Sequence, residues 1–338
     1  MKRGMLCFLS VCTIASLLSL AAPIIEVTDQ MDQTVAVSTP VERIVSVYGM
    51  GTYYLYALGA SDRLVRAWYV GVKTIAQAPE EMFRFEPHLE ELLTSGDPSI
   101  EEMIALDPDL ILVDGSRHGA FAEQMLDLGV PVLQFCVETP ERLQEALLLV
   151  AETLGGEAQR RAALFGESYH RITATVAEDL ALLAAADRAR VLFIGTDLLR
   201  VASGDMYQTL LLEAAGGSSV SAELSGSWNE VSMEQVLLWN PDVIIIPPYG
   251  PVQPSDILDD PVWQSVAAVR DGRVHRMPRY IAPMDTPVPE SLLGVAWLAS
   301  VLYPEQVSID LASEVHAFYA TYYGMPLSEE ELEALTRR

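Results

Sequence analysis

The chain has 338 residues, with 47 aspartates and glutamates against 21 lysines and arginines, and its formal net charge at pH 7 is −26. This excess of acid excludes proteins that bind nucleic acid or anionic membrane surfaces, because both interactions depend on cationic side chains. Hydrophobic residues make up 50% of the chain, which is enough for two sizeable cores, and the length suits two domains.

Residues 1–22 have the pattern of a secretory signal peptide. Cationic residues at positions 2 and 3 precede an apolar stretch over residues 5–20, and small residues follow where a signal peptidase would cut. The apolar stretch is shorter than the ~20 residues of a membrane-spanning helix, so we expect export to the periplasm rather than a membrane anchor. Lipid attachment at Cys12 is not expected, because Val11 is larger than the small residue that precedes a lipidated cysteine.

Cleavage of this peptide would leave Cys136 as the single cysteine. One cysteine cannot form an internal disulfide, which excludes a small disulfide-stapled scaffold. Because residues 130–137 are largely apolar, we expect Cys136 to be a buried small hydrophobe.

Residues 23–154 have the pattern of an N-terminal α/β lobe. The expected elements are a β hairpin over residues 24–37, a strand over 40–47, a helix that ends at Leu58 before Gly59, a strand over 63–69, an irregular segment over 71–98, a helix and strand over 99–113, a loop over 114–119, a helix to Leu128, a strand over 130–135 and a helix over 140–154. Alternation of strands and helices is typical of a parallel sheet covered by helices.

Two segments of the chain repeat one pattern. Residues 99–112 and 232–245 share a Ser-x-Glu start and a Pro-Asp pair at one offset, 232 minus 99, of 133 residues. In each, the serine can cap a helix whose first turn is acidic, and an apolar strand follows the proline. The offset exceeds the roughly 20–50 residues of a solenoid repeat. It therefore indicates two similar lobes with a ligand cleft between them, although a helix followed by Pro, Asp and a strand also occurs in α/β proteins generally.

A long helix is expected between the two copies. Residues 157–186 contain no proline and one glycine, and a helix of that length would be about 45 Å long at ~1.5 Å per residue. We expect residues 155–188 to link the two lobes as one rigid helix. The alternative is an ordinary helix inside one lobe.

Residues 189–338 have the pattern of a C-terminal lobe. The expected elements are strands over residues 190–195 and 199–202, a helix over 207–215, a loop over 226–230, the second copy of the repeat, a helix, turn and strand over 263–277, a helix from 286 to 302, and helices over 310–323 and 328–336. The last helix begins with a capping box at Ser328 and Glu331. The expected fold is α/β, with two lobes of mainly parallel sheets flanked by helices and joined by one long backbone helix.

These motifs, in this order behind a signal peptide, resemble the class III periplasmic substrate-binding proteins of ABC importers. The resemblance covers nearly the whole mature chain and rests on residues 43–49, the Leu58-Gly59 helix end, the two repeat units, and residues 226–234, 263–274 and 289–299. It implies a monomeric binding protein, with no cofactor, that captures a small ligand in the periplasm. It also implies a partner, a transmembrane permease dimer with its ATPase.

The ligand class stays open at this point. The family handles ferric siderophores, haem and cobalamin, so a metal chelate is the first candidate, and some branches bind molybdate or tungstate oxyanions, which is the alternative. The chain departs from cobalamin binders in its longer segment 71–98, and it has Glu290 where some relatives carry arginine. An enzyme is not expected, because no nucleophile elbow, phosphate loop or paired-histidine motif is present, although a metal chelatase on a similar fold is a third alternative.

The candidate ligand-binding residues follow the ends of expected strands, where ligands of parallel sheets bind. Trp228 also lies six residues before Glu234, a spacing that resembles a cleft aromatic of cobalamin-binding relatives, although it could instead be a core residue. The candidates are Tyr48, Gly49, Met50, Arg117, Trp228, Tyr249, Arg279 and Tyr280.

Two further sets of residues have a specific expectation. The resemblance implies that Glu101 and Glu234, one per lobe, dock onto permease arginines, whereas a first-turn glutamate could also serve the helix dipole alone. No resident metal is expected, because the five histidines are scattered. The one trio that could be considered for a metal ion is His118, His275 and Asp285.

Overall fold

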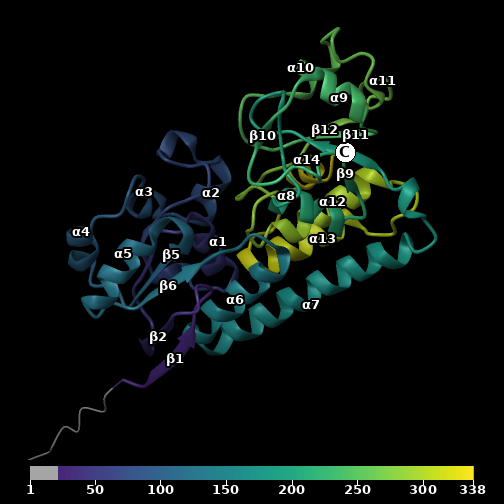
Figure 1. Ribbon diagram of the computed structural model, residues 1–338. Helices are drawn as coiled ribbons and strands as arrows, with labels where there is room; N and C mark the ends of the chain where they lie inside the picture. The colour runs from purple at the N-terminus through teal and green to yellow at the C-terminus, as the bar shows by residue number, and fades with distance from the viewer. Residues whose placement is uncertain (1–21, 338) are drawn as a thin grey trace, which may run out of the picture.

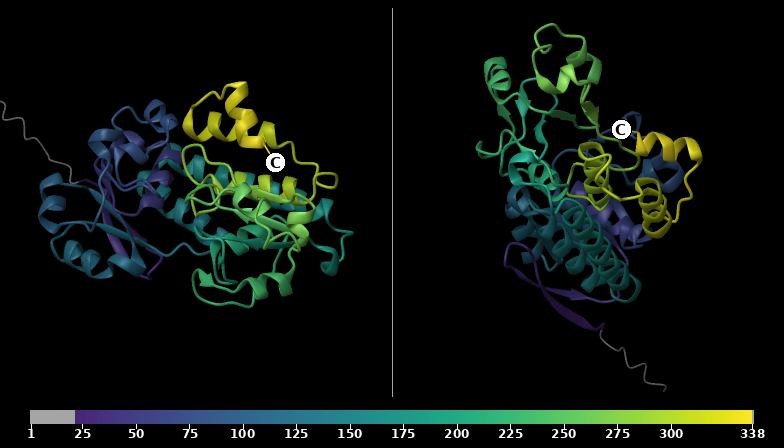
Figure 2. Two further views of the ribbon diagram at one scale, coloured as in Figure 1. Left: turned by 90° about the horizontal axis from the view of Figure 1, so that it is seen from above. Right: turned by 90° about the vertical axis from the view of Figure 1, so that its right-hand side faces the viewer.

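The computed structural model describes residues 22–337, so the signal peptide predicted over residues 1–22, Cys12 included, lies outside the described residues except for its last position. The described chain forms two α/β lobes that lie side by side, and one long helix, α7 (Gly156–Asp179), runs along the base of both (Figures 1 and 2). None of the helices within residues 22–337 combines the length and the apolar character that a bilayer crossing requires.

Each lobe contains a four-stranded sheet in which all strands are parallel. In the N-terminal lobe the spatial order is β4 (Leu64–Ala67), β3 (Ile44–Ser46), β5 (Leu110–Asp114) and β6 (Val132–Phe135). In the C-terminal lobe it is β9 (Ser218–Ser219), β7 (Arg190–Phe193), β11 (Val243–Ile246) and β12 (Val274–Arg276). Both sheets place their strands in the order second, first, third, fourth along the chain, which confirms the predicted fold class and the duplication.

Helices cover both sheets (Figure 1). The N-terminal lobe has α1 (Gly49–Ala57), α2 (Glu80–Phe85), α3 (Leu89–Leu92), α4 (Ile100–Leu106), α5 (Gly115–Asp127) and α6 (Pro140–Leu154). After α7 come α8 (Tyr207–Ala214), α9 (Met233–Trp239), α10 (Pro254–Leu258), α11 (Ala267–Arg270), α12 (Ser291–Leu302), α13 (Leu311–Phe318), the π-helical turn η4 (Tyr319–Tyr323) and α14 (Glu329–Thr336). Two antiparallel pairs, β1 (Ile24–Thr28) with β2 (Thr34–Ser38) and β8 (Arg200–Val201) with β10 (Asn229–Glu230), complete the strands.

The linking helix is shorter than the sequence predicts. Helix α7 has 24 residues and ends at Asp179, which makes it about 36 Å long at ~1.5 Å per residue, not 45 Å. The apolar periodicity continues past this point, but Leu180 leaves the helix and packs into the core beside Gly216, where a Cβ atom would lie 2.4 Å from the leucine Cδ1 atom. A contact with a distant segment therefore ends the helix, and no local signal marks that end.

The segment expected as a loop over residues 114–119 is instead the first part of α5. The Asp114 carboxylate accepts hydrogen bonds from the backbone N–H groups of Ser116 and Arg117, and so caps this helix directly after β5. The backbone is kinked at His118, which has a φ angle of −114°.

The repeated segments have the same local structure in both lobes. Ser99 and Ser232 cap α4 and α9 as predicted, since each hydroxyl accepts a hydrogen bond from the backbone N–H three residues later. Both helices have seven residues, and both end at a residue in the left-handed region, Asp107 with φ of 47° and Asn240 with φ of 43°.

The aspartate of each Pro-Asp pair fixes the start of the first strand of its lobe. Asp109 accepts hydrogen bonds from the N–H groups of Glu42 and Arg43, just before β3, at 2.8 Å each. Asp242 accepts one from the N–H of Arg190, the first residue of β7, at 2.9 Å. The repeated Pro-Asp pair thus serves strand registration, a role that charged hydrogen bonds to backbone donors fill well.

The lobes share a hydrophobic core at their base. One cluster of buried residues includes strand residues of both sheets together with α12, α13 and η4. Across this junction the Tyr54 hydroxyl of α1 donates to the Pro287 carbonyl at 3.0 Å, and the Phe85 ring of α2 lies edge-on to Tyr323, with centroids 4.8 Å apart. A shared core of this kind favours small changes of the angle between the lobes over large ones.

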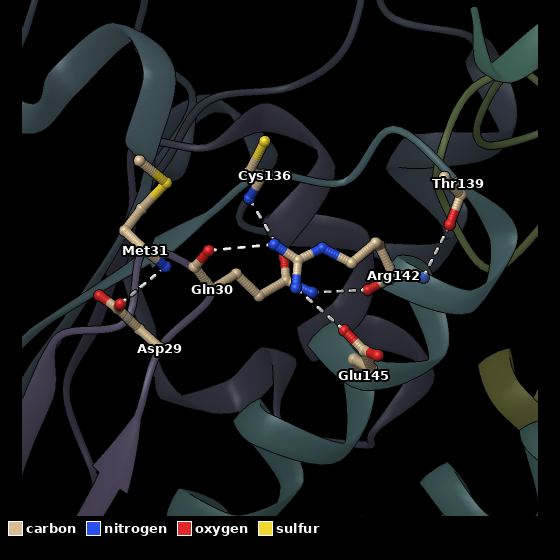
Figure 3. A network of polar contacts seen from close by, with 7 residues as sticks. All are labelled: Asp29, Gln30, Met31, Cys136, Thr139, Arg142 and Glu145. Carbon is tan, nitrogen blue, oxygen red and sulfur yellow. Dashed lines mark hydrogen bonds and ion pairs between the residues drawn. The ribbon is translucent and has the colours of Figure 1, made fainter. Parts of the chain in front are cut away.

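The N-terminal hairpin is fastened to the corner between β6 and α6 (Figure 3). The buried Asp29 carboxylate accepts from the N–H groups of Met31 and Gln134, and the Gln30 amide bonds to the Cys136 N–H and the Arg142 carbonyl. Cys136 is half-buried and not, as expected, buried: its backbone N–H belongs to this network, and its sulfur points away from it.

Candidate ligand-binding cleft

A pocket lies at the carboxyl ends of β3, β4 and β5, where the strand order of the N-terminal sheet changes direction. Its volume is about 250 Å³. Such a switch point is the position at which parallel sheets bind ligands. The lining includes Tyr48, Gly49, Met50, Lys73, Arg117 and His118, so the structure brings together four of the predicted ligand-binding residues in the N-terminal lobe.

Helix α1 begins at this pocket with no side chain capping it. Tyr48 is in the N-cap position in an extended conformation and makes no side-chain cap hydrogen bond. The first backbone N–H groups of a helix have no partner within the helix, so those of Gly49 and Met50 are available to a ligand. Gly49 also allows close packing, because a Cβ atom there would lie 3.2 Å from the backbone of Tyr69 and Val70.

The lining of the pocket is cationic although the protein is acidic. Lys73, one of two lysines in the chain, and Arg117 both line it, against the single carboxylate of Asp114, which is already engaged as the cap of α5. Arg117 also lies 3.5 Å from the exposed Asp97 carboxylate. Burial, and then the neighbouring Arg117, lower the pKa of His118, so this imidazole is neutral at pH 7, and its Nδ1 atom is buried without a hydrogen-bond partner.

Arg279 of the C-terminal lobe reaches the edge of this pocket. Its Nη1 atom lies 3.8 Å from the position that a Cβ atom on Gly71, a lining residue, would occupy. Its Nε and Nη2 atoms are shielded from solvent and have no hydrogen-bond partner. A guanidinium with unused donors at a cleft is suited to planar, bidentate contact with an oxyanion.

Two buried carboxyl groups lie behind Arg279. Asp285 accepts hydrogen bonds from the Tyr249 hydroxyl at 2.7 Å and the Gln208 amide at 3.4 Å, and Glu290 accepts one from the Tyr323 hydroxyl. Burial raises the pKa of Asp285 to about 6 and the pKa of Glu290 to about 7, while the hydrogen bonds and the positive charge of Arg279 oppose this rise. Each carboxyl group retains one oxygen atom with no hydrogen-bond partner.

The remaining predicted ligand-binding residues have different surroundings. The Tyr249 hydroxyl donates its hydrogen bond to Asp285. Trp228 is half-buried against Gly195, below the guanidinium of Arg200, and does not line the pocket of Tyr48. The Tyr280 hydroxyl donates to Glu331 of α14 at 2.7 Å and also bonds Arg84 of α2, so it ties a helix of each lobe together and does not line that pocket.

Glu101 and Glu234 lie outside the cleft, on α4 and α9, at the ends of the lobes that are remote from α7 (Figure 1). Both side chains are exposed. The backbone N–H of each glutamate and the hydroxyl of its cap serine, Ser99 or Ser232, hold its pKa below the usual range. Among residues 22–337 neither glutamate forms an ion pair, so both carry an unneutralised charge near pH 7.

Several residues of the cleft were missed from the sequence. Lys73 and Gly71 lie in the irregular segment 71–98, and the one signal for them was the rarity of lysine in the chain. Asp285 was considered only with His118 and His275, and within the described residues no group of three metal-ligating side chains converges on a point. Glu290 was noted only as a departure from relatives.

Three known proteins are similar to this chain in sequence or in structure. Molybdate-binding protein MolA of Haemophilus influenzae is 28% identical over 322 residues, 88% of this chain and 90% of that protein. Its molybdate-bound structure superposes with a TM-score of 0.77 at 26% identity, covering 90% of this chain and 99% of that one. The Vitamin B12-binding protein of Yersinia pestis is 26% identical over 206 residues, 61% of this chain and 69% of that protein.

A periplasmic solute-binding protein of Veillonella parvula shares the fold, with a TM-score of 0.82 at 24% identity over 93% of this chain and 97% of that one. Residues 44–281 match the protein family described as Periplasmic binding protein, and this span includes both sheets and most of the cleft. The resemblance inferred from the motifs is thereby confirmed, and the chain belongs to the periplasmic binding protein family.

Proposed function

We propose that the protein is the solute-binding component of an ABC importer in the periplasm, and that its ligand is a tetrahedral oxyanion of the molybdate or tungstate type. The observation that carries the ligand class is the guanidinium of Arg279: two of its nitrogen atoms have no hydrogen-bond partner, and its Nη1 atom lies near Gly71, at the edge of a pocket lined by Lys73 and Arg117. In a chain with a net charge of −26, this concentration of cationic donors favours an anion.

The geometry suits a small polyoxygen anion held between the lobes. The free N–H groups at the start of α1 would contact oxygens on one side, and Arg279 would contact oxygens on the other. Because such donors are already in place on rigid elements, the anion would order few side chains on binding. The MolA protein of H. influenzae, whose name and structure refer to molybdate, aligns with most of this chain and so supports the same ligand class.

A metal chelate, the first candidate from the sequence, is less well supported. The pocket volume of about 250 Å³ is below the ~300–1,000 Å³ of pockets that enclose drug-sized ligands, and a corrinoid is larger still. Trp228, the aromatic residue that suggested a corrinoid, packs beside Gly195 outside this pocket.

Delivery to a permease is the second part of the proposal. Glu101 and Glu234 present two exposed, unneutralised carboxylates, one on each lobe, and so offer two-point registration on a partner with cationic residues. No catalytic step is part of the proposed function: the ligand is bound and released unchanged.

A panel of ligands tests the ligand class. Isothermal titration of the mature protein with molybdate, tungstate, sulfate, phosphate, cyanocobalamin, haemin and a ferric siderophore should give saturable 1:1 binding with molybdate or tungstate and none with the chelates. The variant Arg160→Gln, which loses an exposed cation of α7 that does not line the pocket, should bind the oxyanion like wild type. Tight binding of a chelate with no response to either oxyanion would overturn the ligand class.

A further inference from the structure

Both helices that carry a docking glutamate also expose large apolar side chains. On α4, Ile104 lies three residues after Glu101 and is 48% exposed. On α9, Leu237 lies three residues after Glu234 and is 40% exposed, and the following Leu238 is 78% exposed. Residues three and four apart share one face of a helix, so on each lobe the carboxylate and an apolar side chain are neighbours.

The two exposed faces are equivalent by the internal repeat. Ile104 and Leu237 are related by the same 133-residue offset, 237 minus 104, as the two glutamates. The residue before each of them, Met103 or Val236, is fully buried beneath the helix. In each lobe, therefore, one apolar residue of the helix is buried in the core and the next residue is exposed to solvent.

The fold does not require these exposed side chains. Three of the eleven large hydrophobic residues that are exposed within residues 22–337 are on these two seven-residue helices. A polar residue at any of the three exposed positions would be compatible with the helix and would leave the buried Met103 and Val236 in place. Singly scattered exposed apolar residues need no explanation, but recurrence at equivalent places of the two lobes sets these apart and favours an interaction surface.

We infer that Ile104 on one lobe, and Leu237 with Leu238 on the other, are apolar anchors that dock the protein onto a membrane permease that presents the same surface twice. This inference rests on the proposed function, and it names the part of the interface that holds the complex together once the glutamates have oriented it. A two-fold symmetric partner fits because the two faces are copies of each other. Each partner surface would have a cationic group beside an apolar recess.

A second copy of this chain fits the same faces poorly. Each face carries an unneutralised glutamate, and the whole chain has a net charge of −26, so pairing two such faces would place like charges together. Juxtaposed like charges across an interface disfavour association. The permease is therefore the occupant to which the structure points.

Binding of the mature protein to its cognate permease–ATPase complex in lipid nanodiscs tests the inference. Ile104→Ser and Leu237→Ser should each weaken the complex about fivefold or more, with a roughly multiplicative loss in the double variant, because the two sites are on different lobes. The matched control is Leu148→Ser on α6, a leucine that is 54% exposed on a helix outside the repeat, and it should bind like wild type.

Importer binding at high salt, together with the oxyanion affinity of each variant, distinguishes apolar docking from docking by charge and from a ligand-binding role. The losses from Ile104→Ser and Leu237→Ser should persist at high salt, whereas those from glutamate variants should shrink, since only charge interactions are screened. Oxyanion affinity should be unchanged in all of them. If wild type binds the importer and the serine variants bind equally well, the inference is wrong while the proposed function stands. If wild type does not bind the importer at all, the proposed function fails, and the inference with it.

Discussion

The Nη1 atom of Arg279 lies 3.8 Å from the position that a Cβ atom on Gly71 would take, so a guanidinium of the C-terminal lobe borders the pocket of the N-terminal lobe. The lobes also meet through apolar residues at their base and through the hydrogen bonds of Tyr280 with Arg84 and Glu331. The position of Arg279 makes it sensitive both to a ligand in the pocket and to the angle between the lobes.

Replacement of this arginine should weaken the oxyanion complex selectively. Arg279→Lys keeps one positive charge near Asp285 and Glu290 but loses the planar fork, so we expect about a tenfold or larger rise in Kd for molybdate, ~1.4 kcal/mol, with little change in Tm. Isothermal titration and a thermal melt of the same sample measure both. An equal Kd for Arg279→Lys and wild type would exclude Arg279 from the ligand contacts.

The start of α1 gives a second, independent prediction. Gly49→Ala places a Cβ atom 3.2 Å from backbone atoms of Tyr69 and Val70, so α1 must shift away from the β4 loop that borders the pocket. We expect a loss of about 1 kcal/mol of stability and a weaker oxyanion complex. The control is Gly119→Ala in α5, where the nearest atom, Oε1 of Gln134, is 3.9 Å from the new Cβ atom. It should be neutral or stabilising by up to ~1 kcal/mol, because alanine favours a helix.

Glu290 should make stability depend on pH in a direction opposite to that of a salt-bridged carboxylate. Burial raises its pKa in the folded state from the ordinary 4.5 to about 7. Between these values the folded state binds more protons than the unfolded state, so this group's contribution to stability is complete below about pH 4.5 and is lost as pH rises through about 7.

Comparison with Glu290→Gln isolates that contribution from those of other groups. The glutamine resembles the protonated acid, so the variant should match wild type near pH 5 and be more stable by about 1–3 kcal/mol at pH 8. Urea unfolding at the two pH values provides the measurement. A variant that is less stable than wild type at pH 8 would mean that the ionised carboxylate is well compensated by Arg279.

The glutamates of the repeat should affect docking and not ligand binding. Reversal of both charges, Glu101→Arg with Glu234→Arg, should lower affinity for the importer about tenfold or more at low salt, while the Kd for oxyanion stays that of wild type. Glu178→Arg, an exposed glutamate of α7, carries the same type of change and should leave docking intact. Reduced oxyanion affinity in the double variant would place the two glutamates at the cleft instead.

The sequence predicted well those features that depend on neighbouring residues. The caps at Ser99 and Ser232 follow from a serine three residues before a helical N–H. The helix predicted after Tyr48 begins at Gly49 as α1, although the strand before it, β3, covers only residues 44–46 of the predicted 40–47. The start of α5 was missed although Asp114 is itself a capping residue, so the necessary signal was present.

Features that depend on distant contacts could not be predicted in this way. The end of α7 is set by the contact between Leu180 and Gly216, and the buried position of Glu290 depends on Tyr323 of η4. Tyr280 follows a strand as predicted for a ligand contact, yet its hydroxyl is taken by Glu331, a residue 51 positions later. Periodicity and spacing carry no information about such long-range partners.

A crystal structure of the protein with tungstate tests the proposed oxyanion site most directly, because the anomalous scattering of tungsten locates the anion without assumptions. We expect one tungsten position in the pocket between the start of α1 and the guanidinium of Arg279, with Lys73 nearby. Tungsten bound only at other positions would rule out the proposed site. So would a crystal that shows no bound tungsten but binds a metal chelate in the cleft.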